Sequence, residues 1–290
     1  MIRKIGIIGT GRVGTALSRV FTRSGFETYV AGRTYQSSVE SSRLSSAEPQ
    51  TKEYIAKNAD LILLAVQDSE IEKAASEIAP YLNEKQIVAH LSGALDCSNL
   101  AFLKSMKASV HPVKSFADPV TSAESFTGTI LVCEGDDGAL PSLRDVVKSI
   151  EGVFVQIRPE DKPKYHLALT IASNFSVLIA DLSEELLLEA GFKEEDARPI
   201  LLNLIEGTLS NMKNLGITKA LTGPIERGDI ATVKKHLSAI ESPLFKEFYV
   251  DGSILLVDIA KKKSFVDNIL WEKEDNLAKY EDIKKFLEEK

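Results

Sequence analysis

The sequence predicts an α/β fold in which a doubly wound parallel sheet is followed by an all-helical domain. A short apolar strand runs into a glycine-rich turn and an amphipathic helix over residues 5–21. Apolar strands then alternate with helical segments as far as residue 157. Beyond residue 160 we find helical periodicity and no convincing strand. We therefore expect two domains, 1–158 and 159–290, as is typical of a chain of 290 residues.

Composition and charge restrict the class of protein. The 44% of hydrophobic residues is ample for two cores. Of the net charge of −7, residues 159–290 carry most, with 18 Lys and Arg against 24 Asp and Glu. An acidic second half disfavours nucleic acid or an anionic membrane as a partner. Two scattered cysteines, no signal-peptide pattern and no apolar run near 18 residues predict a soluble cytoplasmic protein.

The glycine-rich turn has the pattern G-x-G-x-x-G between a strand and a helix. Gly9 permits the tight turn, Gly11 lets a pyrophosphate approach the backbone, and Gly14 lets the helix pack on the sheet. The free N–H groups of the helix N-terminus favour phosphate. We expect dinucleotide contacts from the whole turn, which comprises Gly9, Thr10, Gly11, Arg12, Val13 and Gly14.

The end of the second strand, residues 27–31, predicts which dinucleotide binds. NAD-specific sites usually place Asp or Glu here for the ribose 2′-hydroxyl. This chain has no acid between Thr28 and Val39, and has Arg33 and Thr34 instead. Arg33 could pair with a 2′-phosphate, with Thr34 adding a hydroxyl, or it could be a solvated loop residue. We therefore expect NADP.

The remaining elements of the sheet follow in order. Residues 35–50 are predicted to be a loop or an irregular helix. The strand at 59–66 leads into a loop beside the cofactor, where we expect contacts from Val66 and Gln67. The predicted strands after it are 86–90, 108–110, 129–133 and 153–157, and the predicted helices are 70–82, 97–106 and 140–150.

Helices in the second part are predicted at 161–190, 195–214, 229–240 and 242–262. The loop at 216–228 contains Arg227, a candidate anchor for a substrate carboxylate.

Polar residues follow two of the predicted strands. His90, Ser92 and Gly93 come at the end of the first, where they could hold a substrate carboxylate or carbonyl, or could form a turn with a core histidine. His111 ends the next strand. It could exchange a proton with a substrate during hydride transfer, or could be a structural histidine.

The first long helix carries His166, Thr170 and Asn174 four residues apart, so they share one face. Polar groups in so apolar a helix need partners, which could be a substrate and the nicotinamide amide or other helices. The four histidines show no spacing typical of metal ligands, so no metal is expected.

Four motifs carry a resemblance over nearly the whole chain. HLSG at 90–93, VHPVKSF at 110–116, YHLALTIASN at 165–174 and LTGPIERGD at 221–229 together resemble the Rossmann-like proteins with a DUF2520 C-terminal domain. The helical domain of that family resembles those of 6-phosphogluconate dehydrogenase and the ketopantoate reductases. The HP motif also resembles that of prephenate dehydrogenases, whose histidine contacts the substrate hydroxyl, which implies that role for His111. The helix of the related dehydrogenases has Lys where this chain has Thr170.

These observations predict an NADP-dependent oxidoreductase acting on a small oxo or hydroxy acid, with ketopantoate as the first substrate to consider. His111, Ser92 and Asn174 are the expected catalytic groups. A homodimer through the helical domain is also expected. The alternative is a dinucleotide-binding sensor or assembly protein without turnover. The expected substrate contacts are His90, Gly93, His166, Thr170 and Arg227.

Overall fold

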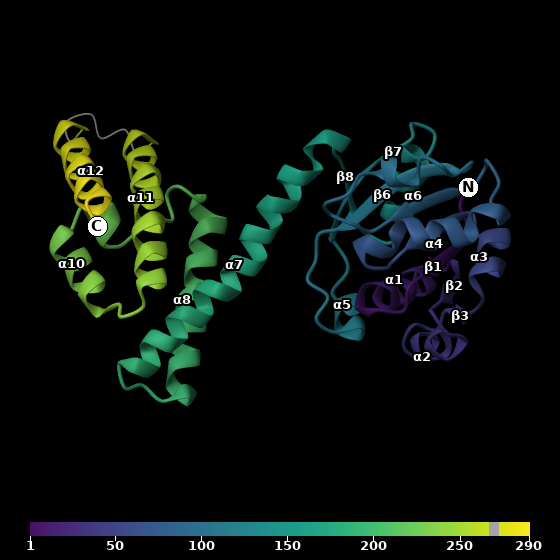
Figure 1. Ribbon diagram of the computed structural model, residues 1–290, viewed down its shortest axis with the longest axis horizontal. Coiled ribbons are helices and arrows are strands. Elements are labelled where there is room, and N and C mark those ends of the chain that lie inside the picture. Colours follow the sequence, from purple (N-terminus) through teal and green to yellow (C-terminus); the bar gives the residue numbers. More distant parts are fainter. Residues whose placement is uncertain (267–272) are drawn as a thin grey trace. The chain divides into compact units, whose positions relative to one another are not determined.

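The computed structural model describes residues 1–266 and 273–290, and its chain falls into two compact units, Met1–Ser176 and Val177–Lys290 (Figure 1). The first unit holds one sheet of eight strands in the order β3-β2-β1-β4-β5-β6-β7-β8. Its strands are β1 Lys4–Ile8, β2 Glu27–Ala31, β3 Glu48–Pro49, β4 Leu61–Leu64, β5 Ile87–His90, β6 Met106–Pro112, β7 Ile130–Gly135 and β8 Val153–Gln156. Only β6 and β7 pair antiparallel.

Helices cover both faces of this sheet, as the predicted doubly wound fold requires. The apolar faces of α1 Arg12–Arg23, α5 Pro119–Glu124 and α6 Leu140–Ser149 pack on one side. The helices α3 Lys52–Asn58 and α4 Ile71–Ile78 pack on the other. Alternate strand residues enter the two cores, so that Ile7 belongs to one and Ile8 to the other.

Three local predictions need correction. Residues 35–50 contain a regular helix, α2 Tyr35–Ser45, with Thr34 as its N-cap, and the short strand β3. The helix predicted at 97–106 is wrong, because only the 3₁₀ turn Cys97–Leu100 forms there. That segment buries Leu100 and Leu103 and must reach the start of β6 at Met106, which leaves no room for further helical turns. The β6 strand also begins earlier than predicted.

Strand β6 extends past its neighbour on one side. Its last pair with β5 is Ser109 with His90. Residues Val110–Pro112 continue the strand and pair only with β7, where His111 lies opposite Val132. The backbone that carries His111 is therefore part of the sheet.

The second unit, by itself, contains helices only, in the described residues 177–266 and 273–290. They are the last part of α7 Lys162–Glu189, then α8 Glu194–Leu215, α9 Pro224–Arg227, α10 Ile230–Ala239, α11 Pro243–Val266 and α12 Lys273–Glu288. The four helices α9 to α12 share one core, in which Val233, Val257 and Tyr280 are buried. The four predicted helices of this region are all present, with ends that differ by up to four residues.

Helix α7 is unusually apolar for its exposure. With its lead-in turn it spans Pro159–Glu189, and within the described residues it is the one helix long and apolar enough to cross a membrane. A single such helix is weak evidence of a membrane span, because core helices of soluble proteins have the same composition. We missed this run in the sequence because His166, Thr170 and Asn174 interrupt it.

Candidate functional site

The glycine-rich turn joins β1 to α1, and its three glycines occupy different environments. Gly9 has a φ of +126°, and a Cβ there would lie 2.1 Å from the carbonyl oxygen of Ala65. A Cβ on Gly14 would lie 2.0 Å from the carbonyl oxygen of Gly9. Both glycines are therefore required by the packing of the turn itself.

Gly11 is different, because a Cβ there would meet no atom of the described residues within 4 Å. Gly11 is exposed and is the N-cap of α1, so the first N–H groups of that helix have no side-chain acceptor at this residue. Open space in front of free N–H groups is what a dinucleotide pyrophosphate needs. Arg12 is exposed beside it, while Val13 packs against the core. These residues fit a bound dinucleotide.

The end of β2 lies next to this turn. A Cβ on Gly32 would lie 3.0 Å from the Thr10 hydroxyl, which places the two loops together. Arg33 is exposed, and Thr34 accepts a hydrogen bond from the Ser37 amide and so caps α2. The first turn of α2 contains no acid. A cation and the positive end of a helix dipole thus stand where a ribose phosphate would lie.

The loop after β4 is tied to the loop after β5. Val66 packs against one core and Gln67 is exposed. The Ser92 hydroxyl donates to Asp68 Oδ2 over 2.7 Å and accepts from the Leu95 amide over 3.0 Å. Because its hydrogen-bonding capacity is used within the chain, Ser92 holds these two loops together.

His90 also belongs to this turn. It is fully buried, its Nδ1 accepts from the Ser92 amide, and its Nε2 lies 3.0 Å from the Asp96 carbonyl oxygen. Burial lowers the pKa of His90, so the neutral ring accepts at Nδ1 and donates at Nε2. This geometry favours the core-histidine interpretation of His90 over a substrate contact.

Two histidine rings meet at Gly93, and a tyrosine contacts one of them. The Nδ1 of His111 lies 2.7 Å from the Tyr165 hydroxyl, and the ring centroids of His111 and His166 are 6.4 Å apart. A Cβ on Gly93 would lie 2.7 Å from the His166 ring and 3.0 Å from Nε2 of His111. Glycine is therefore the residue that lets both rings approach the turn.

The environment of His111 leaves one ring nitrogen for a ligand. Burial, followed by the positive charge of Lys162, lowers the pKa of His111 to about 4. Burial raises the pKa of Tyr165 to about 12. At neutral pH the pair is therefore a neutral imidazole and a protonated phenol. Nε2 of His111 has no hydrogen-bond partner among the described residues and is not fully buried.

The described contacts do not join the other predicted residues to the cluster of Gly93, His111 and His166. Thr170 and Asn174 follow His166 by one and two turns of α7, about 6 and 12 Å along the helix axis. Asn174 is exposed. Arg227 is the last residue of α9 in the second unit, where it lies beside the N-cap Asp229. The described contacts thus join Gly93, His111 and His166.

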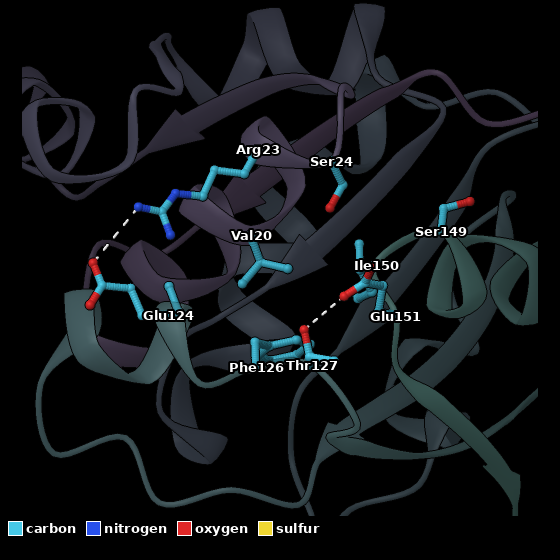
Figure 2. Close-up of a pocket in the computed structure, with 10 residues that line it drawn as sticks. Val20, Arg23, Ser24, Glu124, Phe126, Thr127, Ser149, Ile150 and Glu151 are labelled. Atoms are coloured by element: carbon cyan, nitrogen blue, oxygen red, sulfur yellow. Dashed lines mark hydrogen bonds and ion pairs between the residues drawn. The ribbon is translucent and has the colours of Figure 1, made fainter.

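A separate pocket lies on the first unit, with a volume of about 350 Å³ (Figure 2). Its lining includes the C-terminal ends of α1, α5 and α6, which in this fold lie at the opposite edge of the sheet from the glycine-rich turn. Glu124 pairs with Arg23 there, and Thr127 donates to Glu151. This pocket does not belong to the candidate site.

Sequence reasoning missed three residues of this region. We did not assign a role to Tyr165, although it stands beside His166 in the same motif. Lys162 and Glu134 are almost fully buried below the site, at 1% and 2% exposure. Nothing in the sequence distinguishes Lys162 from the exposed Lys164, because both precede the same apolar helix.

Two family models match the chain. A Rossmann-like domain model matches residues 2–112, and the model of a domain of unknown function, DUF2520, matches residues 129–253. The chain has no match among curated protein sequences.

Solved structures share the fold over most of the chain. Protein TM1727 from Thermotoga maritima is 25% identical, with a TM-score of 0.73 over 90% of this chain and 99% of that one. Protein BF3122 from Bacteroides fragilis, provisionally named an NADP oxidoreductase, is 22% identical, with a TM-score of 0.73 over 87% and 96%. Plasmodium falciparum pyrroline carboxylate reductase, solved with NADP bound, is 16% identical, with a TM-score of 0.57 over 97% and 98%. The last two likenesses concern the fold alone.

Proposed function

The chain is a member of the Rossmann-like proteins with a DUF2520 domain, and we propose that it is an NADP-dependent oxidoreductase. The observation that carries the proposal is a neutral imidazole, His111, held by a tyrosine and leaving Nε2 for a ligand. It ends a strand of the same sheet that presents the glycine-rich turn. The substrate class is a small oxo or hydroxy acid.

The nicotinamide, when bound, supplies or accepts hydride. A group of the protein must donate or accept the accompanying proton. When the Tyr165 hydroxyl donates to Nδ1, the His111 proton is on Nε2, from which it can pass to a carbonyl oxygen. Nδ1 receives the tyrosine proton in the same step, and the resulting phenolate is reprotonated from solvent. In the opposite tautomer Nε2 is a base that takes the proton of a hydroxy acid.

Other residues of the site have supporting roles in this proposal. Gly11 and the N-terminus of α1 hold the pyrophosphate, and Arg33 with the start of α2 holds the 2′-phosphate. His166 and Gly93 bound the space next to Nε2 of His111. Ser92 orients the turn rather than meeting the substrate. We keep Asn174 and Thr170 as nicotinamide or substrate contacts and Arg227 as a carboxylate anchor.

Turnover of a 2-oxo acid panel tests this function. Ketopantoate is the first compound of that panel, and oxidation of NADPH is followed by absorbance. Native protein should turn over one or more members, and His111→Ala should lower kcat by about 10²–10⁴-fold while NADP affinity is kept. NADP binding without turnover of any oxo acid would favour the sensor alternative. Thr170, where related dehydrogenases carry lysine, is the residue that favours that alternative.

We also propose a cytoplasmic homodimer formed through the helical region. Exposed apolar residues form a stripe along α7 at Leu167, Ile171, Phe175 and Leu178. A stripe next to a polar row fits a helical protein surface, whereas a lipid-exposed helix would be apolar all round. The proposed occupant is a second copy of this chain.

Two residues of this stripe allow a test of the interface. Ile171 and Phe175 on α7 are 48% and 45% exposed. Native protein should have the mass of a dimer in analytical ultracentrifugation, and the double variant Ile171→Glu, Phe175→Glu should be a monomer. The variant Lys148→Glu, which changes the charge of α6 in the sheet unit, is the control and should remain a dimer.

A further inference from the structure

A buried lysine lies beneath the candidate site. Lys162 is the first residue of α7 and is 1% exposed. Its ammonium group donates to the Ser92 carbonyl oxygen over 2.9 Å and to the hydroxyl of Ser109. The carboxylate of Glu134 on β7 lies 3.9 Å from the same Nζ. Four segments of the chain therefore meet at one amine.

The register of these residues places them directly below the histidine and tyrosine. Lys162 precedes Tyr165 by three residues, so both lie on one face of α7. Ser109 precedes His111 by two residues, so both lie on one face of β6. The bond between Lys162 and Ser109 thus joins the same two elements as the bond between Tyr165 and His111, one layer further in.

The Ser92 carbonyl gives the lysine a second connection to the site. This oxygen belongs to the residue before Gly93, whose α-carbon faces the rings of His111 and His166. Ser109 donates to the same oxygen over 3.3 Å. The position of the turn relative to the His111 ring therefore depends on Lys162.

A contribution to the stability of the fold does not explain why Lys162 is buried here. Burying an ammonium group is costly, and an apolar residue of similar volume is often as good or better for stability. The nearest carboxylate, that of Glu134, is beyond hydrogen-bond distance at 3.9 Å, and its Oε2 has no hydrogen-bond partner among the described residues. The pair is therefore not optimised as an ion pair.

We propose that Lys162 is a positioning residue of the site, whose ammonium group fixes the Ser92 carbonyl and the Ser109 hydroxyl beneath the His111–Tyr165 pair. The proposal rests on the function proposed above for the role of His111. Lys162 does not meet substrate or cofactor and acts through the groups that it holds.

A positioning lysine also has an electrostatic effect that a purely structural residue lacks. The positive charge of Lys162 is the second cause, after burial, of the low pKa of His111. His166 acts in the same direction, Asp68 opposes it, and Tyr165 faces the ring as a hydrogen-bond partner. Removing the charge of Lys162 should therefore raise the pKa of His111, even where the fold is kept.

The titration of His111 by NMR, on the full chain labelled at histidine, tests the proposal. Native protein should titrate at about pH 4. The variant Lys162→Met should move the midpoint by about one pH unit or more toward the ordinary value of ~6.5. Because the methionine side chain would leave the Glu134 carboxylate without a cation, the double variant Lys162→Met, Glu134→Gln supplies the same measurement without a buried carboxylate.

Lys164→Met is the matched control, since this lysine lies two residues along the same helix and is exposed. It should leave the His111 midpoint unchanged. A native midpoint near 6.5, or a folded Lys162 variant with the native midpoint, would overturn the proposal. The titration needs neither cofactor nor substrate. A protein that shows the shift but turns over no oxo acid would therefore contradict the proposed function alone.

Discussion

The hydroxyl of Tyr165 lies 2.7 Å from Nδ1 of His111, with the two rings nearly perpendicular at 83°. The bond joins the first turn of α7 to the end of β6 and directs the other ring nitrogen away from the tyrosine. It therefore determines which atom of His111 can exchange a proton with a ligand.

Tyr165→Phe should lower turnover with little effect on NADP affinity. The phenyl ring keeps the packing but leaves Nδ1 without its partner, which costs about 1–3 kcal/mol, or roughly 5–150-fold in kcat. Tyr249→Phe is the matched control, because it removes the same kind of bond, to His236 in the second unit. An equal loss of kcat in both variants would argue against a special role for Tyr165.

Gly11→Val should abolish dinucleotide binding in a protein that still folds. The Cβ of the new side chain would meet no atom within 4 Å in the part of the chain that the structure describes, so the side chain fills the space assigned to the pyrophosphate. Gly14→Val should instead destabilise the fold, because its Cβ would overlap the Gly9 carbonyl. Calorimetric titration with NADP and thermal unfolding distinguish these outcomes. A folded Gly11→Val protein with native affinity would show that the turn binds no pyrophosphate.

Arg33→Ala should weaken NADP binding by about 1.5–3 kcal/mol and leave NAD binding nearly unchanged, because a charge-assisted bond to the 2′-phosphate is lost. Arg43→Ala, in the last turn of the helix that follows, is the control and should affect neither cofactor. The measurement is the dissociation constant of each dinucleotide. Equal losses for NADP and NAD in Arg33→Ala would contradict the assignment of a phosphate contact.

Acid should destabilise the protein through His111. Its pKa is about 4 in the folded chain and ~6.5 in the unfolded chain, so between these values only the unfolded chain binds the proton. The contribution of His111 to stability is therefore complete above about pH 6.5 and is lost as the pH falls toward 4. We expect about 1–3 kcal/mol for this partly buried ring.

Urea unfolding at about pH 7 and about pH 4.5 measures this effect. The loss of unfolding free energy between the two pH values should be smaller in His111→Gln than in native protein. The same loss in both proteins would show that another group causes the acid sensitivity.

Most helices and strands could be predicted from the sequence, because each of them depends on a local, periodic pattern of apolar residues. The long helix α8 was predicted at 195–214 and is observed at Glu194–Leu215. The predicted helix at 97–106 failed because the position of β6 decides its conformation, and that depends on distant strands. The antiparallel pairing of β6 with β7 has the same origin, since strand direction is a property of the whole sheet.

The site was predictable only in outline. Its location at the ends of β5 and β6 follows from the fold class. The role of each polar residue does not follow from the fold class, because His90 and His111 both end strands in the sequence. One has both ring nitrogens bound within its own turn, and the other has one nitrogen left over. The single partner of His111, Tyr165, comes from the distant helix α7, whose packing no local pattern specifies.

The extension of β6 beyond β5 has a consequence for how such a site could change its specificity. His111 is carried by backbone that β7 holds in register, so little reorganisation of the imidazole is needed when a ligand arrives. The facing turn at 91–95 has no such ladder. It is held by single side-chain bonds, from the Ser92 hydroxyl to Asp68 and from Lys162 to the Ser92 carbonyl, so one substitution can shift its position. Selection for new substrates should therefore enrich substitutions in that turn while leaving residues 110–112 intact. A saturation library covering both segments would reveal this asymmetry.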